Sequence, residues 1–263
     1  MTPETNPVPD RNLLAPLGDR LRAGERLIAA WSSLAEPALA ELMVRQGFDT
    51  LVLDMQHGAH TVGSAMEGIG AAALAGVPAI VRIPVGEFAT ASRALDLGAA
   101  GVIAPMINTV EQAHAFAAAA KYPPMGERSW GPHRAVTLTG LTPAAYLQAG
   151  NRLHVALAMI ETREAMAALD DILAVPGIDG VFVGPSDLSL ALTGRVDPGC
   201  PEVDAALTAV AARAAAAGKV AGLFCFSGEV ARAMGARGFG LCSVGTDALF
   251  LAAAARAALT AAR

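Results

Sequence analysis

Residues 180–187 read GVFVGPSD, an apolar run that ends in a glycine–proline turn and then enters a potential helix. Similar runs are AIVRI at residues 79–83 and GVIAP at residues 101–105. Because these runs are apolar on both faces, they predict buried strands of a parallel sheet. Alanine-rich segments with helical signatures separate the runs, so the chain is predicted to alternate strand and helix.

This alternation recurs along the whole chain. The predicted strands are Arg26–Trp31, Thr50–Leu53, Ala79–Arg82, Gly101–Ala104, His154–Ile160, Gly180–Val183, Val220–Cys225 and Gly240–Val244. Eight strand–helix units in about 250 residues predict an α/β fold, a TIM-type (β/α)8 barrel. A doubly wound sheet is the alternative, but its glycine motif has one nominal match, residues 68–73, which lies inside a helical run.

The domain limits follow from the same pattern. Residues 1–15 are predicted to be a disordered arm, and residues 16–263 a single barrel domain. The longest connection, Met106–Arg152, is predicted to hold one helix and then an irregular loop over Tyr122–Thr142, a length typical of functional or interface segments. Five glycines stand where helix C-caps are expected, namely Gly47, Gly76, Gly98, Gly150 and Gly218.

Composition excludes several classes of protein. The net charge is −5 and the 19 Lys and Arg residues are dispersed, which argues against a nucleic-acid partner. No uncharged apolar run reaches the roughly 18 residues of a membrane span, so no membrane partner is expected. The 3 cysteines are widely spaced and form no CxxC motif, which favours a reducing cytoplasm over a disulfide framework.

In a (β/α)8 barrel, catalytic residues lie where the strands end. The ionisable residues at those positions are Asp54, His57, Arg82, Glu161 and Asp187. Glu161 and Asp187 end neighbouring strands, and two carboxylates with positions left open suit Mg²⁺ or Mn²⁺. Arg82 is expected to meet a carboxylate or enolate oxygen, and His57 is expected to move a proton.

Structural alternatives exist for these residues. Asp187 could cap the helix that follows it, and Arg82 could form a salt bridge with Asp54 or Glu161. Lysine chemistry is disfavoured, because Lys121 and Lys219 are the only lysines and neither ends a strand. A divalent metal, an arginine and a histidine on one rim instead fit enolate chemistry on a 2-oxo acid.

Seven segments resemble, in order, the HpcH/HpaI family of metal-dependent class II 2-oxo-acid aldolases, of which 4-hydroxy-2-oxoheptanedioate aldolase is an example. They are LVLDMQHGAH, PAIVRIPVGE, LDLGAAGVIAPM, KYPPMGERSWGP, AMIETREA, GIDGVFVGPSDLSLAL and AAGKVAGLF. The resemblance covers about residues 21–258. It implies a barrel of the phosphoenolpyruvate/pyruvate-binding kind with Mg²⁺, Mn²⁺ or Co²⁺. It also implies a homo-hexamer, a dimer of trimers, that exchanges its last helix, which Asp247–Ala262 would supply.

The resemblance also implies roles for individual residues. Glu161 and Asp187 match the metal ligands, and His57 matches the catalytic base. Arg82 matches the arginine that stabilises the enolate, and Asp96 matches the acid that raises the basicity of the base. Asp54 is expected to be catalytic. The expected substrate-binding residues are Gln56, Gly184, Pro185, Ser186, Trp31 and Phe224.

Within that group, the backbone N–H of Ser186 matches the group that receives the substrate carboxylate, at a potential helix N-terminus. Trp31, Trp130 and Phe224 are candidates for the wall of the aldehyde pocket, or for packing and interface contacts.

Two positions depart from the family pattern. Gln56 stands where the family has a glutamate, and Met159 stands where a glutamine is common. The sequence Asp-Met-Gln-His at residues 54–57, together with Arg128–Pro132, resembles a branch of aldolases that accept hydroxypyruvate.

The expected function is therefore a class II aldolase, a carbon–carbon lyase that joins or cleaves a pyruvate or 3-hydroxypyruvate enolate and an aldehyde. The alternatives are an oxaloacetate-type decarboxylase or CoA-ester lyase, and, in another class, a non-catalytic metal-binding oligomer. The expected ligands are a small 2-oxo acid and an aldehyde.

Overall fold

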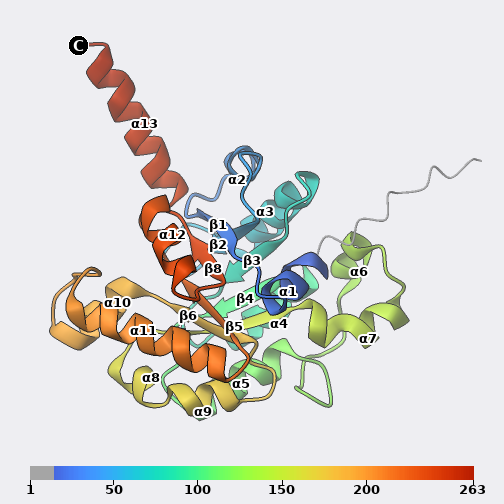
Figure 1. Ribbon diagram of the computed structural model, residues 1–263. Coiled ribbons are helices and arrows are strands. Elements are labelled where there is room, and N and C mark those ends of the chain that lie inside the picture. Colours follow the sequence, from blue (N-terminus) through green and yellow to red (C-terminus); the bar gives the residue numbers. More distant parts are fainter. Residues whose placement is uncertain (1–14) are drawn as a thin grey trace, which may run out of the picture.

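The computed structural model describes residues 15–263, so the predicted arm lies outside the described residues except for Ala15. Eight parallel strands close a barrel in chain order (Figure 1). They are β1 (Leu27–Ser32), β2 (Thr50–Asp54), β3 (Ala79–Arg82), β4 (Gly101–Ala104), β5 (Val155–Ile160), β6 (Gly180–Val183), β7 (Val220–Leu223) and β8 (Leu241–Ser243). The predicted (β/α)8 barrel is confirmed.

The barrel closes where its first strand meets its last. Ala29 of β1 pairs with Thr50 of β2 on one side and with Ser243 of β8 on the other. Nearly every strand residue is buried, because large side chains such as Trp31 and Phe182 fill the interior and helices cover the outside. This double burial explains why the strands read as continuous apolar runs.

Thirteen helices lie along the described part of the chain. They are α1 (Ala15–Arg22), α2 (Pro37–Val44), α3 (Val62–Leu74), α4 (Phe88–Asp96), α5 (Val110–Ala120), α6 (His133–Thr139), α7 (Pro143–Leu153), α8 (Arg163–Ala167), α9 (Leu169–Ala174), α10 (Pro185–Thr193), α11 (Pro201–Ala216), α12 (Gly228–Ala236) and α13 (Asp247–Ala261). Thr61 and Thr109 begin α3 and α5 with capping boxes. The glycine motif at residues 68–73 lies within α3, as expected from its helical context.

Two sequence-based expectations about the long connection are wrong. The segment predicted to be an irregular loop contains α6, and α7 follows it. No side chain caps the start of α6, so its usual sequence signal is absent. Gly150 is not a C-cap but lies inside α7, where an added Cβ would crowd the Tyr122 ring at about 3.0 Å. The other four predicted cap glycines have positive φ.

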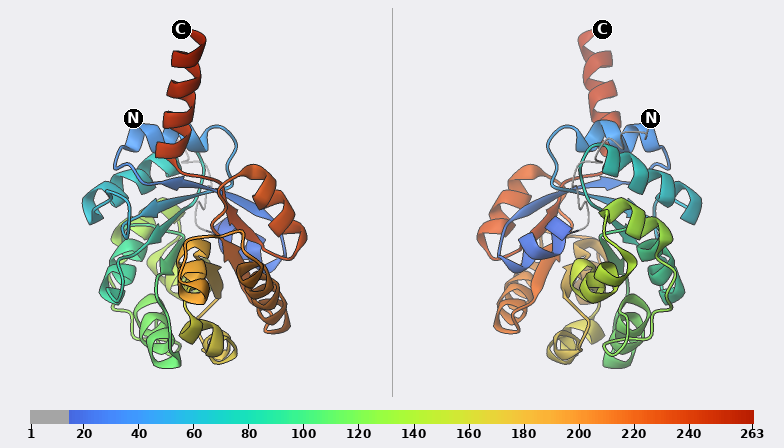
Figure 2. Two further views of the ribbon diagram at one scale, coloured as in Figure 1. Left: turned by 90° about the vertical axis from the view of Figure 1, so that its left-hand side faces the viewer. Right: turned by 90° about the vertical axis from the view of Figure 1, so that its right-hand side faces the viewer.

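The last helix stands away from the barrel. Figures 1 and 2 show α13 projecting beyond the other elements, with the C-terminus at its far end. From Leu249 onward all of its side chains are exposed, including Phe250 and Leu251. None of the described helices combines the length and apolar character needed to cross a bilayer.

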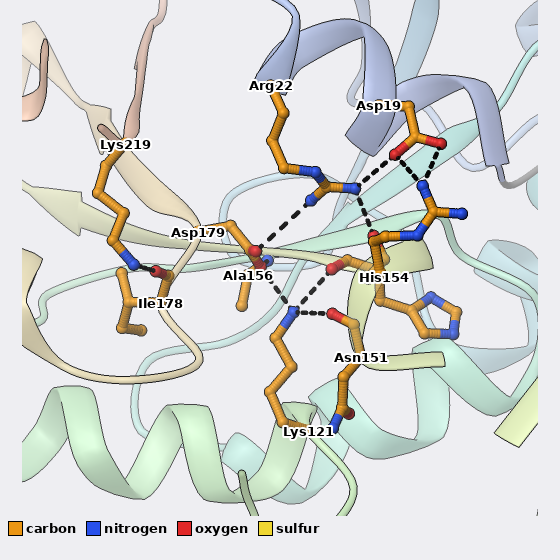
Figure 3. A network of polar contacts seen from close by, with 10 residues as sticks. Asp19, Arg22, Lys121, Asn151, His154, Ala156, Ile178, Asp179 and Lys219 are labelled. Carbon is orange, nitrogen blue, oxygen red and sulfur yellow. Dashed lines mark hydrogen bonds and ion pairs between the residues drawn. The ribbon is translucent and has the colours of Figure 1, made fainter. Parts of the chain in front are cut away.

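A network of charged side chains lies at the N-terminal mouth of the barrel (Figure 3). Lys121 Nζ donates to the carbonyl oxygens of Asn151 and His154, at 2.9 and 2.7 Å, and to Asp179 Oδ2 at 2.6 Å. The same Asp179 oxygen accepts a hydrogen bond from the backbone N–H of Ala156 at 2.8 Å. Burial lowers the pKa of Lys121, and the neighbouring Asp179 charge opposes that shift.

Candidate active site

A cavity of about 230 Å³ opens at the C-terminal mouth of the barrel. It is lined by Trp31, Ser33, Asp54, His57, Arg82, Met159, Gly184, Pro185, Ser186, Asp187, Phe224, Phe226 and Thr246. These residues come from strand ends and from the loops after them, where the sequence predicted a site. Of the predicted site residues, Gln56, Asp96 and Glu161 are not part of the lining.

An ion pair joins the ends of β2 and β3. Arg82 Nε and Nη2 donate to the two carboxylate oxygens of Asp54, at 2.9 and 2.6 Å. Trp31 Nε1 donates to Asp54 Oδ2 at 3.3 Å, and the Arg82 guanidinium lies 4.9 Å from the centre of the Trp31 ring. Burial opposes ionisation of Asp54, but the hydrogen bonds and charge of Arg82 outweigh it and lower the pKa of Asp54. The salt-bridge alternative for Arg82 is thus present in the structure, alongside its exposure to the cavity.

The loop after β2 carries His57. Its backbone N–H donates to Asp54 Oδ1 at 3.3 Å, as does that of Gln56 at 3.0 Å. The His57 side chain is exposed and lines the cavity. The Gln56 side chain instead keeps a buried Oε1 that has no hydrogen-bond partner among the described residues.

Glu161, which directly follows β5, is only 1% exposed. Its Oε1 accepts a hydrogen bond from the backbone N–H of Met106 at 2.8 Å, whereas its Oε2 is buried with no partner in the described chain. Burial raises the pKa of Glu161 to about 7, and the negative charge of Asp187 acts in the same direction. The buried carboxylate is therefore half-satisfied.

Helix α10 brings Asp187 to the same rim. Gly184 is its N-cap, no side chain caps it, and Asp187 lies exposed in its first turn. The capping alternative for Asp187 is therefore not observed. A Cβ on Gly184 would overlap Glu161 Oε2, so a larger residue there would force the Glu161 carboxylate to move. The first-turn N–H groups, including that of Ser186, form an end of the cavity suited to an anion.

The donor set fits a hard divalent cation. Glu161 has a free, buried oxygen beside Gly184, and the charge of Asp187 is close enough to raise the Glu161 pKa. In the described part of the chain, no group of three or more His, Cys, Asp and Glu side chains is placed to hold a metal. Two carboxylates leave coordination positions for water and substrate, as Mg²⁺ commonly has them.

Several residues at or near the cavity were not predicted from the sequence. Met106, which is not part of the lining, donates its N–H to Glu161 and has a positive φ of 55°, a conformation that no local sequence signal announces. Ser33, Phe226 and Thr246 also line the cavity. Each lies within three residues of a strand end, and this position in the loop is the signal that could have identified them.

Two predicted residues do not reach this cavity within one chain. Asp96 ends α4, just before β4 begins, which places it toward the N-terminal mouth; there its carboxylate accepts from Arg128 Nη2 at 2.6 Å. Trp130 packs against the Tyr122 and Tyr146 rings and is 45% exposed. The prediction that Asp96 supports His57 thus has no hydrogen bond behind it in the described chain.

Comparison with known proteins identifies the class to which this fold and site belong. The sequence model of the HpcH/HpaI aldolase/citrate lyase family matches residues 27–254. The chain belongs to this family, and the predicted resemblance is confirmed.

Particular relatives make the comparison more specific. The chain is 42% identical to a hydroxypyruvate/pyruvate aldolase of Rhizorhabdus wittichii, over 91% of this chain and 95% of that protein. It is 34% identical to a 2-keto-3-deoxy-L-rhamnonate aldolase of Shigella sonnei, over 90% and 89% respectively. A solved structure of a family member from Burkholderia cenocepacia superposes with a TM-score of 0.86 at 31% identity, covering 95% of this chain and 99% of that one. The predicted carbon–carbon lyase of the aldolase kind is therefore confirmed.

Proposed function

We propose that this aldolase holds Mg²⁺ or Mn²⁺ between Glu161 and Asp187. Its reaction joins or cleaves the bond between an aldehyde and the enolate of pyruvate or 3-hydroxypyruvate. The names of relatives that are similar over about nine-tenths of the chain support this choice of donor. The cavity of about 230 Å³ suits a small 2-oxo acid with a short aldehyde.

One observation carries the proposal. Glu161 Oε2 is a buried carboxylate oxygen without a hydrogen-bond partner among the described residues, and Gly184 provides the space beside it. An unpartnered buried carboxylate is costly unless a cation or a proton meets it. Asp187, on the same rim, supplies the second hard oxygen donor.

The remaining residues divide the chemistry among themselves. When bound, the cation would polarise the keto group of the 2-oxo acid. Arg82, held in place by Asp54, presents its guanidinium to the oxygen on which negative charge develops. His57 takes the proton from the carbon next to the keto group; that carbon then attacks the aldehyde, and the new alkoxide takes a proton back.

Substrate recognition would come from the cavity walls. The Ser186 N–H, in the first turn of α10, is placed to receive the carboxylate of the 2-oxo acid. Trp31 and Phe224, whose rings meet edge to face at 5.1 Å, supply an apolar wall for the aldehyde. Arg82 is the one Lys or Arg side chain in the described lining, which disfavours a CoA ester with its several phosphates.

The setting of the enzyme is part of the same proposal. A homo-hexamer that exchanges α13 would cover the apolar side chains that this helix exposes, such as Leu249, Phe250 and Leu251. Three free, buried cysteines fit a reducing cytoplasm.

A competition assay tests the proposal. The metal-loaded enzyme is given equal pyruvate and 3-hydroxypyruvate with glyceraldehyde, and the products are resolved by mass. We expect new carbon–carbon bonded products, loss of product with a chelator, and recovery with Mg²⁺ or Mn²⁺. Asp187→Ala should lose metal binding in a calorimetric titration, whereas Glu67→Ala, on the exposed face of α3, should not. Full activity in chelator, or an unchanged titration for Asp187→Ala, would contradict the metal assignment.

A further inference from the structure

We propose that Asp247 is a positioning residue for the loop that carries His57. It acts through the hydroxyl of Ser32 and the imidazole of His60. The inference rests on the proposed role of His57 in moving the proton. It depends on a hydrogen bond between Ser32 and Asp247, which are 215 positions apart in the sequence.

Asp247 is the first residue of α13, yet it is only 1% exposed. Its Oδ1 accepts from the backbone N–H of Ser33 at 2.9 Å, and its Oδ2 accepts from that of Leu34 at 2.9 Å. The N–H of Ala248 adds a third backbone donor at 2.8 Å. Asp247 forms no ion pair with the described residues, so main-chain dipoles hold its charge in place.

The hydroxyl of Ser32 extends this anchor toward His60. Ser32 Oγ lies 3.1 Å from Asp247 Oδ2 and 3.1 Å from the carbonyl oxygen of Leu34, and both of these atoms can only accept. The same hydroxyl lies 2.9 Å from His60 Nε2, so Ser32 connects the Asp247 carboxylate to the imidazole. On its other side, His60 Nδ1 lies 3.2 Å from Ser64 Oγ, so the imidazole is held between two hydroxyl groups.

These contacts clamp the far end of the His57 loop. His60 is three residues beyond His57, and the N–H of Ala59 donates to the carbonyl of Ser33 at 2.8 Å. Between them, Gly58 packs so closely on the Asp54 carbonyl that a Cβ would overlap it. Asp54 accepts hydrogen bonds from the N–H groups at the start of the loop. The Asp247 network fixes its other end, so His57 lies between two anchored segments.

The metal ligands lie on other elements. Glu161 and Asp187 follow β5 and β6, and neither shares a hydrogen bond with Asp247, Ser32 or His60 in the described chain. A loss confined to the His57 loop should therefore slow proton transfer and leave cation and 2-oxo-acid binding intact. This separation makes a positioning role distinguishable from a general structural one.

The experiment uses full-length protein with Mg²⁺ and follows deuterium uptake into the methyl group of pyruvate by NMR. We expect Asp247→Asn and His60→Leu to lower the exchange rate about tenfold, the scale of a lost supporting hydrogen bond. Metal affinity and the KM for pyruvate should stay within about twofold. His60→Gln, whose amide can still hydrogen-bond to a hydroxyl, should recover most of the rate, and Asp170→Asn, in the first turn of α9, is the matched control.

Two further measurements separate the possible outcomes. In a His57→Ala background, Asp247→Asn should cause no additional loss of exchange, because the loop then has no base to position. Backbone deuterium exchange over residues 55–60 should rise in Asp247→Asn and not in the control. Wild-type exchange rates in both variants, or equal losses in metal affinity, would overturn the inference. A wild-type enzyme that neither exchanges nor forms product would instead contradict the proposed function, while the backbone measurement still tests the clamp.

Discussion

The two mouths of the barrel each contain an ionisable side chain that is buried to the same extent, but the two side chains differ in how many of their hydrogen bonds are made. Lys121 at the N-terminal mouth and Glu161 at the C-terminal mouth are both 1% exposed. Lys121 donates to three oxygens within 2.9 Å (Figure 3). Glu161 accepts one hydrogen bond and leaves one oxygen without a partner in the described chain.

The difference shows how the barrel separates stability from function. A buried charge whose hydrogen bonds are all made stabilises the arrangement around it, whereas one left incomplete costs free energy until a ligand arrives. Lys121 ties α5 to the start of β5 and to Asp179, just before β6. Glu161 directly follows β5, and its Oε2 lies beside Gly184 of the cavity lining. Four substitutions would break or sharpen this contrast, in order of their expected effect on activity.

Glu161→Gln should have the largest effect. Activity is expected to fall about 10³-fold or more, because the amide removes the negative charge of a proposed metal ligand. The metal-free protein should become more stable at pH 8, since the raised pKa means that the folded state opposes ionisation of Glu161.

The pH dependence of that gain follows from its sign. The folded protein binds more protons than the unfolded chain between pH 4.5 and about 7, so wild-type stability falls as the pH rises through that window. The gain of the variant should approach about 3 kcal/mol at pH 8 and vanish near pH 4.5. Urea unfolding of both metal-free proteins measures it, and equal stability at pH 8 would show that the Glu161 carboxylate is not held in an unfavourable site.

His57→Ala should lower the aldol rate by roughly 10²-fold, the usual contribution of a positioned acid or base. Metal affinity should be unchanged, because His57 lies on the loop after β2 and the proposed ligands follow β5 and β6. Steady-state kinetics with a metal titration checks both. Near-wild-type turnover would remove His57 from the mechanism.

Gly184→Ala should weaken metal binding by about 10- to 100-fold, because the new methyl group would displace Glu161 Oε2. The matched control is Gly228→Ala at the start of α12, where an added Cβ meets no atom within 4 Å. Calorimetric titration with Mn²⁺ compares them. Equal metal affinities for the two variants would mean that Glu161 does not need the space beside Gly184.

Lys121→Met should leave kcat unchanged and lower the free energy of unfolding by about 2–4 kcal/mol. The variant removes the cation beside Asp179 and the hydrogen-bond donor of two carbonyl oxygens. Lys219→Met removes a single hydrogen bond to the Ile178 carbonyl and should cost less than about 1.5 kcal/mol. Urea unfolding ranks the two variants. A loss of activity at temperatures well below unfolding would argue against a purely structural N-terminal mouth.

Most of the site could be predicted from sequence because parallel strands bring their carboxyl ends to one mouth. Asp54, His57, Arg82 and Asp187 all line the predicted cavity for that reason. Asp96 could be found only through family resemblance, and within one chain it pairs with Arg128 rather than with His57. A resemblance carries a residue's role but not the contact that performs it.

The amino-acid sequence alone determined the strand order, the family and the rim on which the ionisable residues gather, since each depends on local periodicity or on motifs. Tertiary structure alone decided which of those side chains have all their hydrogen-bonding atoms paired. The N–H of Met106, in the loop after β4, donates to Glu161, and the N–H groups of Ser33 and Leu34 donate to the carboxylate of Asp247. Such contacts join loops distant in the chain, and their hydrogen bonds depend on backbone conformations that no local pattern specifies.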